Sequence, residues 1–297
     1  MSAELVLAPE FLLPDNLPDS VGYAPGEIPG DRVLAEVGFF VPDYIDSPNP
    51  EWMRLMPRLQ VVQLPTVGFD AALPHLPEGV TLCNAAGVHE QSTAELTVGT
   101  IIARWRGIDR AARNMADGRW DHRRGRSLQG AVVVIVGAGG VGSRIGDALR
   151  PLGCRVEMVG RSARTGVWGA ERLPELIASA NVVVLAVPLT KETEGMVDAA
   201  FLERMPDGSL LVNVARGTVV ITDDLLDALP RIEAVLDVVE PEPLPSDHPL
   251  WSAPGVLITP HIGGDTDAFP RLARELIDRQ VRTWRAGAAL SNVVVGP

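Results

Sequence analysis

Short apolar runs alternate with polar, helix-forming segments along most of this chain. An uninterrupted apolar run of about four to eight residues is typical of a strand buried on both faces of a parallel sheet. Such runs occupy residues 131–136, 155–159, 182–187, 209–214, 234–239 and 256–259. Helices are predicted between them at residues 143–152, 173–178 and 223–229. This alternation predicts a doubly wound, parallel α/β sheet in the second part of the chain.

The first 90 residues carry another, shorter set of apolar runs. Strands are predicted at residues 4–7, 33–40, 59–64 and 80–84, and short helices at residues 52–56 and 71–76. Because strands again alternate with helical pieces, this region predicts a smaller parallel α/β unit.

Two longer helices are predicted on either side of the second sheet. Residues 92–115 predict one continuous apolar helix with Ser92 or Thr93 as its N-cap. Residues 267–286 predict the other, with Pro270 in the first turn, where proline is tolerated. Because this helix follows the final strand, we expect it to cross back to the N-terminal unit. The predicted domains are residues 1–90 plus 266–297, which make a discontinuous domain, and residues 91–265.

The composition narrows the range of partners. The formal net charge is −12 and the pI is about 4.9, which argues against general binding to nucleic acid or to an anionic membrane, since both are polyanions. No apolar run approaches the roughly 20 residues of a membrane span. Cys83 and Cys154 have no metal-ligand spacing, so neither a metal site nor a disulfide framework is predicted. Residues 1–9 show no secretory signal, and a cytoplasmic protein is expected.

A glycine-rich loop directly follows the strand at residues 131–136. Glycines at this G-x-G-x-x-G spacing allow a tight turn, let backbone amides approach a pyrophosphate, and let the following helix pack closely. The N-terminus of that helix adds a partial positive charge. A glycine-rich turn between two core elements is the alternative, but the strand before and the helix after favour a dinucleotide site. The residues expected to bind the cofactor here are Gly137, Gly139, Gly140, Val141 and Gly142.

The segment after the next strand indicates which nicotinamide cofactor binds. In the NAD version of this fold an acidic residue ends the second strand and hydrogen-bonds the ribose 2′-hydroxyl. Here Val159 is followed by Gly160, and then by Arg161, Ser162 and Arg164 without a carboxylate. Two arginines and a serine would attract a 2′-phosphate through charge-assisted hydrogen bonds. We therefore expect NADP(H), with NAD(H) as the alternative if this is only a solvated basic loop.

Three further chemical groups stand just after predicted strands. Arg216 follows the strand at 209–214, Glu242 lies in the proline-rich segment after the next strand, and His261 follows the last. The carboxyl ends of parallel strands form the edge where open α/β sheets bind ligands. An arginine that stabilises substrate charge and a histidine that donates a proton suit the reduction of a 2-keto acid. Each residue alone has an ordinary structural explanation, so the inference depends on the three together.

These stretches together strongly resemble the D-2-hydroxyacid dehydrogenase family. The matching motifs occur in the family's order, over most of residues 60–292, at residues 136–142, 187–190, 213–217, 237–245 and 259–264. The resemblance implies an oxidoreductase, usually dimeric, with two Rossmann-like domains, of which the substrate domain is discontinuous, and a cleft that holds the nicotinamide.

The resemblance also implies residue roles. Arg216 looks like the residue that binds the substrate carboxylate and carbonyl oxygen, and His261 like the acid/base. Glu242 looks like its partner, which would favour the imidazolium form of the histidine; Glu240, two residues away, is the alternative that the register disfavours. The backbone amides of Val67 and Gly68 would hold the substrate carboxylate. Further cofactor contacts are implied for Pro188, Thr193, Val214, Ala215, Asp237, His261 and Gly263.

The predicted function is the NADP(H)-dependent interconversion of small 2-keto acids, such as glyoxylate or hydroxypyruvate, and D-2-hydroxy acids. One alternative is oxidation of a phosphorylated hydroxy acid, as in phosphoglycerate dehydrogenases. The other is a dinucleotide-sensing binding protein without catalysis. The resemblance implies a homodimer, in which the helix at 92–115 and the polar loop at 117–129 could bury apolar surface.

Overall fold

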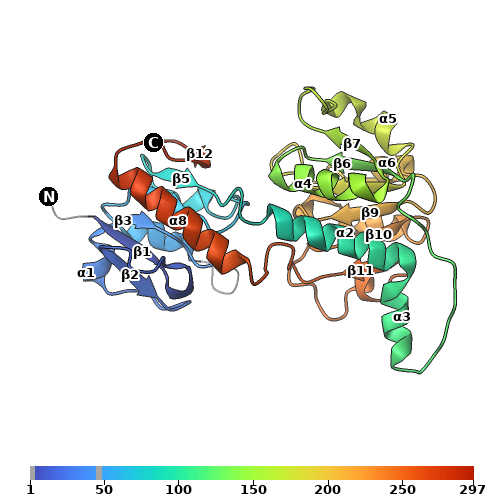
Figure 1. Cartoon of the computed structure of the whole chain (residues 1–297), viewed down its shortest axis with the longest axis horizontal. Helices are drawn as coiled ribbons and strands as arrows, with labels where there is room; N and C mark the ends of the chain where they lie inside the picture. The colour runs from blue at the N-terminus through green and yellow to red at the C-terminus, as the bar shows by residue number, and fades with distance from the viewer. Residues whose placement is uncertain (1–3, 45–48) are drawn as a thin grey trace. The chain divides into compact units, whose positions relative to one another are not determined.

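The computed structural model describes residues 4–44 and 49–297, which fold into two α/β units (Figure 1). Unit 1 comprises Met1–His89 and Thr266–Pro297, and unit 2 comprises Glu90–Asp265. The chain passes between the units twice, so unit 1 is discontinuous. The predicted fold class, two parallel α/β units with the first one discontinuous, is confirmed.

Unit 1 contains a six-stranded sheet in the order β12-β5-β4-β3-β1-β2, parallel except for β12, which pairs antiparallel with β5. Its strands are β1 (Leu5–Pro9), β2 (Ser20–Tyr23), β3 (Val37–Phe40), β4 (Val61–Gln63), β5 (Thr81–Cys83) and β12 (Val293–Val295). Its helical elements are η1 (Glu10–Leu12), α1 (Asp31–Leu34), η2 (Pro50–Leu55), η3 (Leu73–His75) and α8 (Phe269–Arg285).

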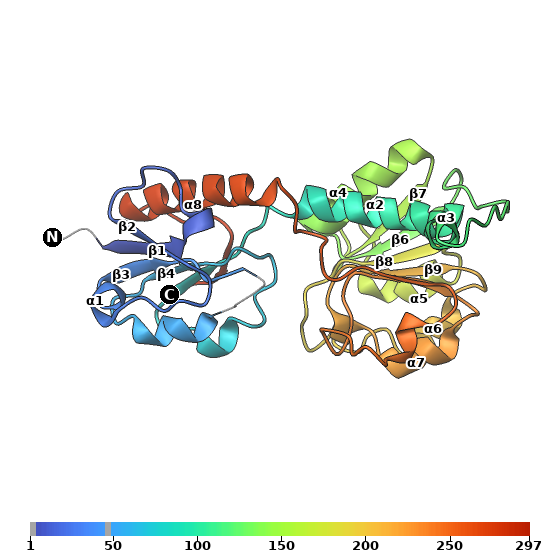
Figure 2. The same ribbon diagram turned by 90° about the horizontal axis from the view of Figure 1, so that it is seen from below.

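Both faces of the unit 1 sheet are buried, because successive side chains of a strand point to opposite faces. Val6, Phe39 and Val61 pack with α8 on one face, whereas Leu7 and Phe40 pack with η2 on the other. Figure 2 shows these two layers of helices on either side of the unit 1 strands. Continuous apolar runs follow from this two-sided burial.

Three details of unit 1 differ from the sequence prediction. Residues 33–40 do not form one strand: α1 ends at Leu34 and β3 begins at Val37. The segments 52–56 and 71–76 lie in 3-10 helices, η2 and η3. The edge strands β2 and β12 were not predicted, because neither is a continuous run buried on both faces.

Unit 2 contains a six-stranded, all-parallel sheet in the order β11-β10-β9-β8-β6-β7. Its strands are β6 (Val132–Val136), β7 (Arg155–Val159), β8 (Val182–Leu185), β9 (Leu210–Asn213), β10 (Glu233–Leu236) and β11 (Val256–Ile258). The strand order reverses at β6, which pairs with β7 on one side and β8 on the other. Such sheets bind ligands at this reversal, outside the carboxyl ends of the strands.

Helices cover both faces of the unit 2 sheet (Figures 1 and 2). They are α2 (Glu90–Arg106), α3 (Ile108–Met115), α4 (Gly140–Leu149), α5 (Leu173–Ile177), α6 (Ala199–Arg204) and α7 (Thr222–Ala228), with the 3-10 elements η4 (Arg150–Leu152), η5 (Ala170–Arg172), η6 (Gly217–Val219) and η7 (Pro249–Trp251). Val133 and Ile135 of β6 pack with α2 and α4, and Val134 and Val136 pack with the layer of α5 to α7. Helix α6, which is capped by Asp198, was not predicted.

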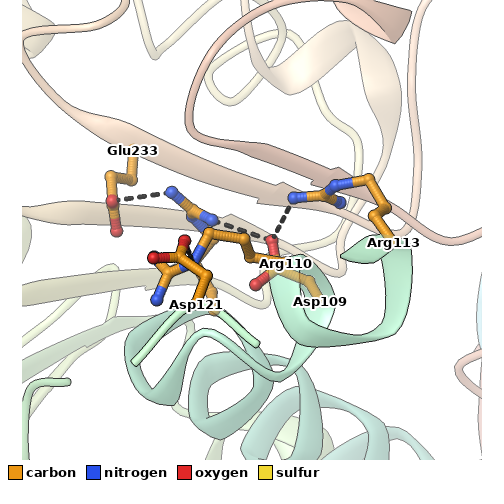
Figure 3. A network of polar contacts seen from close by, with 6 residues as sticks. Asp109, Arg110, Arg113, Asp121 and Glu233 are labelled. Atoms are coloured by element: carbon orange, nitrogen blue, oxygen red, sulfur yellow. Dashed lines mark hydrogen bonds and ion pairs between the residues drawn. The ribbon is translucent and has the colours of Figure 1, made fainter. Parts of the chain in front are cut away.

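The single helix predicted at residues 92–115 is wrong, because the chain forms two helices, α2 and α3. They are separated by Gly107, whose φ of 67° lies in the left-handed region, so the chain turns away from α2 (Figure 1). The helix also begins at Glu90, before the proposed caps. The new direction of α3 is held by Asp109, whose carboxylate lies 2.8 Å from Arg104 and 3.0 Å from Arg113 (Figure 3).

Among residues 4–44 and 49–297, none of the helices combines the length and the apolar character that a membrane crossing requires.

Candidate active site

The glycine loop between β6 and α4 is closed by backbone contacts that tolerate no side chain. Gly137 has a φ of 114°, and a Cβ there would lie 2.2 Å from the carbonyl oxygen of Ala186. A Cβ on Gly142 would lie 1.9 Å from the carbonyl oxygen of Gly137. These two glycines are therefore required by close packing of the chain on itself.

Gly139 differs from these two glycines. It is exposed, and a Cβ there would meet no atom within 4 Å. It directly precedes Gly140, the first residue of α4, whose N-terminal amides carry a partial positive charge. Open space over a helix N-terminus fits a pyrophosphate, which needs the backbone to be accessible. The loop residues thus fit the phosphates of a dinucleotide.

The basic loop after β7 lies against the glycine loop. Its exposed residues Arg161, Ser162 and Arg164 follow the carboxyl end of β7. The Arg164 guanidinium donates a 2.7 Å hydrogen bond to the carbonyl oxygen of Ala138, inside the glycine loop. The positive charge of Arg164 therefore lies beside the glycine loop, where the adenosine ribose of a bound dinucleotide is expected.

The loop after β8 closes on itself through Thr193. The Thr193 hydroxyl donates to the Pro188 carbonyl oxygen at 2.7 Å and accepts from the Thr190 amide at 2.8 Å. Pro188 and Thr193, both predicted cofactor contacts, thus shape this loop. The loop starts beside the glycine loop, because the Ala186 amide donates to the carbonyl oxygen of Val136 at 2.8 Å.

Arg216 lies in the tight loop after β9. The buried Asn213 side chain spans this loop: its amide donates to the Arg216 carbonyl oxygen at 2.9 Å, and its oxygen accepts from the Ala215 amide at 3.0 Å. Gly217 packs against the next strand end, since a Cβ there would lie 1.9 Å from the Val239 carbonyl oxygen. Val214 lies in the same loop, between Asn213 and Ala215.

Asp237 holds the loop that carries His261. It is 4% exposed, and its carboxylate accepts from the Thr259 hydroxyl at 2.6 Å, the Ile262 amide at 3.0 Å and the Gly263 amide at 2.9 Å. These donors flank His261, whose own amide donates to the Asp237 carbonyl oxygen at 2.8 Å. Within this unit, both Asp237 and Gly263 therefore serve the conformation of the histidine loop.

His261 and Glu242 meet, although 19 positions separate them in the sequence. Nδ1 of His261 lies 2.5 Å from Oε1 of Glu242. Glu240 does not make this contact; its backbone oxygen accepts from the Thr222 hydroxyl at 3.1 Å instead. A carboxylate bonded to Nδ1 fixes the ring and directs the other nitrogen, Nε2, away from Glu242.

The surroundings of Glu242 keep it ionised. Burial alone would raise the pKa of this carboxyl, but the hydrogen bond and charge of His261 outweigh it, with smaller effects from the Val239 amide and the Arg216 charge. The net result is a pKa below the ordinary range. Arg216 is thus within electrostatic reach of Glu242, and the three predicted catalytic residues lie at the carboxyl ends of β9, β10 and β11.

Val67 and Gly68 lie in unit 1, in the loop after β4. The Asn84 side chain donates to the Val67 carbonyl oxygen at 2.9 Å, and the Thr66 hydroxyl donates to the Gly68 carbonyl oxygen at 2.7 Å. The carbonyl groups of both residues therefore bond within the unit, and the loop has a defined shape.

Sequence analysis missed two residues that shape the site, Asn213 and Thr259. Both carry short polar side chains at the ends of strands, two or three positions before His261 or Arg216. Asn213 bonds to the backbone of the Arg216 loop, and Thr259 bonds to the Asp237 carboxylate. An asparagine or threonine that ends an apolar strand is the available signal, but which partner it bonds depends on the folded loop.

Comparisons with known proteins identify the family of this chain. The family model described as D-isomer specific 2-hydroxyacid dehydrogenase, NAD binding domain, matches residues 98–263. A human glyoxylate reductase/hydroxypyruvate reductase is 34% identical over 224 residues, which cover 70% of this chain and 68% of that protein. A glyoxylate reductase of Thermofilum pendens is 33% identical over 251 residues, covering 77% and 73%.

The fold is also found among solved structures. A D-isomer specific 2-hydroxyacid dehydrogenase of Xanthobacter autotrophicus Py2, solved with NADPH and MES, is 28% identical with a TM-score of 0.84, covering 99% of this chain and 98% of that one. The resemblance seen in the motifs is thereby confirmed. The chain belongs to the D-isomer specific 2-hydroxyacid dehydrogenase family and is an NAD(P)-dependent oxidoreductase.

Proposed function

We propose that this protein reduces small 2-keto acids, such as glyoxylate or hydroxypyruvate, to D-2-hydroxy acids with NADPH. The observation that carries the proposal is the 2.5 Å contact between His261 Nδ1 and Glu242 Oε1, with Arg216 in electrostatic reach. The family alone leaves the substrate open, and relatives named glyoxylate reductase or hydroxypyruvate reductase support this substrate class.

His261, Glu242 and Arg216 have separate roles in the proposed reaction. A bound reduced nicotinamide would supply the hydride that adds to C2 of the keto acid. His261, held through Nδ1 by Glu242, donates the proton from Nε2 to the substrate oxygen as its C=O bond becomes a C–O bond. Arg216 stabilises the substrate carboxylate and the developing negative charge on that oxygen. In the reverse direction His261 accepts the same proton.

The proposed cofactor contacts lie in unit 2, and further substrate contacts are proposed in unit 1. In unit 2 the glycine loop would hold the pyrophosphate, and Arg161, Ser162 and Arg164 would bind a 2′-phosphate. In unit 1, which we propose as the substrate domain with residues 1–90 and 266–297 as its predicted extent, the amides of Val67 and Gly68 would bind the substrate carboxylate.

The test is NADPH oxidation against a panel of 2-keto acids graded in size and charge, run in parallel with the H261N variant. We expect turnover of the smallest members and a loss of about 100- to 10,000-fold in H261N, since this range is typical for removal of a general acid. NADPH affinity should change little. If NADPH binds tightly but no keto acid is turned over, the protein is a dinucleotide sensor instead.

Cofactor preference is tested separately with R164Q. Loss of one charge-assisted hydrogen bond to a phosphate should weaken NADPH binding by about 10- to 100-fold, and NADH binding by less, because the bond from Arg164 to Ala138 serves both cofactors whereas the 2′-phosphate is present in NADPH alone. R172Q is the matched control, because Arg172 instead pairs with Glu175 at 3.0 Å. A wild-type preference for NADH would overturn the NADP(H) assignment.

A phosphorylated hydroxy acid is the second candidate substrate. It is favoured by a 33% identity over 227 residues to a D-3-phosphoglycerate dehydrogenase of Archaeoglobus fulgidus, 43% of which is covered. Competition between a phosphorylated and an unphosphorylated hydroxy acid separates the two candidates.

We further propose a homodimer formed through the arm, defined as α3 and the loop to Arg126. The arm exposes Ile108, Met115 and Trp120, whose exposed fractions are 53%, 80% and 96%. Large apolar side chains gathered on one projecting element are typical of an interface.

A further inference from the structure

Asn213 is the last residue of β9 and is 1% exposed. Its side chain makes two hydrogen bonds, as a donor to the Arg216 carbonyl oxygen and as an acceptor from the Ala215 amide, at 2.9 Å and 3.0 Å. A neutral amide meets both demands at once, whereas an ionised carboxylate cannot donate and an ammonium cannot accept.

The same loop is held from the neighbouring strand. The backbone carbonyl oxygen of Asn213 accepts from the Asp237 amide at 3.0 Å, and Gly217 lies against the carbonyl group of Val239. The Arg216 guanidinium donates to the Ala215 carbonyl oxygen at 2.8 Å, within the turn that Asn213 closes. Among these contacts, the Asn213 side chain is the one that bonds directly to the backbone carbonyl group of Arg216.

We infer that Asn213 is a positioning residue for Arg216: it fixes the loop so that the guanidinium is placed before substrate arrives. The inference rests on the proposed function, because it assigns Arg216 to the substrate. Removal of the two hydrogen bonds lets the loop relax and misplaces the guanidinium. Misplacement of a catalytic group by about 1 Å can cost on the order of 100-fold in rate.

Two substitutions separate this role from a purely structural one. N213A removes both hydrogen bonds at every pH. N213D keeps the acceptor for Ala215 but, when ionised, cannot donate to Arg216 and adds a buried charge; when protonated it both donates and accepts. The charged residues that bond to Asn213 through their backbone are Arg216 and Asp237, and both are present in wild type, N213A and N213D. Activity of N213D relative to wild type should therefore rise as pH falls, whereas the ratio for N213A stays flat.

The control is N181A. The Asn181 oxygen accepts from the Val132 amide at 2.9 Å, also from side chain to backbone, but at the amino ends of the unit 2 strands. N181A should lower the melting temperature about as N213A does, with less than about a threefold change in kcat/KM. N213A should lower kcat/KM by about 10- to 100-fold, and by little more when added to R216A, because both then act on the same group.

The experiment measures kcat/KM for the best keto acid, the affinity of the NADPH-bound protein for the non-reducible analogue oxamate, NADPH affinity and melting temperature. Equal loss of kcat/KM in N181A, additive losses in N213A/R216A, or a flat N213D ratio would overturn the inference while the proposed function stands. A wild-type protein that neither turns over a keto acid nor binds oxamate overturns the proposed function and the inference with it.

Discussion

His261 has a φ of 53°, in the left-handed region that few non-glycine residues adopt. This backbone conformation is disfavoured for residues with a Cβ, and it is kept where surrounding contacts hold the chain in it. Here the buried Asp237 carboxylate bonds to the residues on both sides of the histidine. The strain is thus located at the residue to which we assign proton transfer, and the Asp237 contacts offset it.

Replacing Glu242 with glutamine should change the pH dependence of reduction. Glutamine keeps the shape but removes the negative charge beside Nδ1, so the imidazolium that donates the proton is less favoured. We expect the alkaline limb of the kcat/KM profile to move to lower pH in E242Q. E240Q is the matched control, because the Glu240 carboxylate does not contact His261, and its profile should match wild type.

The same pair contributes to stability over a defined pH range. The pKa of Glu242 is lowered in the folded protein, so its contribution is present above the ordinary carboxyl range and is lost as pH falls through the lowered value. The difference in melting temperature between wild type and E242Q should shrink as the pH falls below about 4. A difference that grows on acidification would contradict this assignment.

At the level of elements, different glycines of the glycine loop meet different requirements, namely close packing of the chain and open space for a ligand. Gly137 and Gly142 are needed for folding contacts, and Gly139 leaves space outside the chain. G139A should therefore melt within about 2 °C of wild type, as for surface substitutions that disturb no contact. Its NADPH affinity should fall by at least tenfold, because the methyl group would occupy the pyrophosphate position.

G99A is the control for this prediction, because a Cβ on Gly99 also meets no atom within 4 Å but lies in α2. It should leave NADPH affinity unchanged. G137A, by contrast, should lower both stability and NADPH affinity, since the new Cβ would collide with the Ala186 carbonyl oxygen. Unaltered NADPH binding in G139A would contradict the assignment of the open space to the cofactor.

The junction of α2 and α3 depends on a buried charge network (Figure 3). The Asp109 side chain is 2% exposed and pairs with Arg104 and Arg113, while Arg104 also pairs with Glu233 of β10 at 2.9 Å. Burial by itself would raise the pKa of Asp109, but the Arg110 amide and the two arginines lower it overall. The junction therefore ties the arm to the unit 2 sheet.

D109A should lower the free energy of unfolding at pH 7 by about 1 to 3 kcal/mol, because the mostly buried Arg104 loses one of its two carboxylate partners. The measurement is urea unfolding at several pH values. The Asp109 contribution is present above the ordinary carboxyl range and is lost as pH falls through the lowered pKa, so the two proteins should converge at acid pH. D117A, at an exposed pair with Arg119, should cost less than about 1 kcal/mol.

At the scale of the whole molecule, the arm has a fixed base and an apolar surface. At the base, the Arg126 guanidinium lies 4.3 Å from the centre of the Trp105 ring, and the Arg126 amide donates to the Trp105 carbonyl oxygen at 2.9 Å. Farther out, Met115 and Trp120 are exposed. A fixed arm with exposed apolar side chains is suited to contact a second copy.

Replacing Met115 and Trp120 together with serine should convert the dimer to a monomer without lowering the melting temperature of the isolated chain, because both side chains contact solvent in one copy. Sedimentation velocity gives the oligomeric state. W251S is the control at an exposed tryptophan outside the arm and should remain dimeric. A monomeric wild type would refute the dimer proposal.

The sequence alone determined the sheet of unit 2 and was enough to propose its catalytic residues. Strands buried on both faces leave continuous apolar runs, and Arg216, Glu242 and His261 stand in local motifs that need no knowledge of contacts. The sequence also indicated the discontinuous unit, because the helix at 267–286 follows the last strand of the sheet.

Only the tertiary structure decided how those residues are held. The edge strands β2 and β12 and the break at Gly107 carry no periodic signal, since they depend on pairing and on the Asp109 network. Asn213, Asp237 and Thr259 act through hydrogen bonds to loops whose shape exists only after folding. Apolar periodicity is a property of the chain, whereas the partner of a buried polar group is a property of the fold.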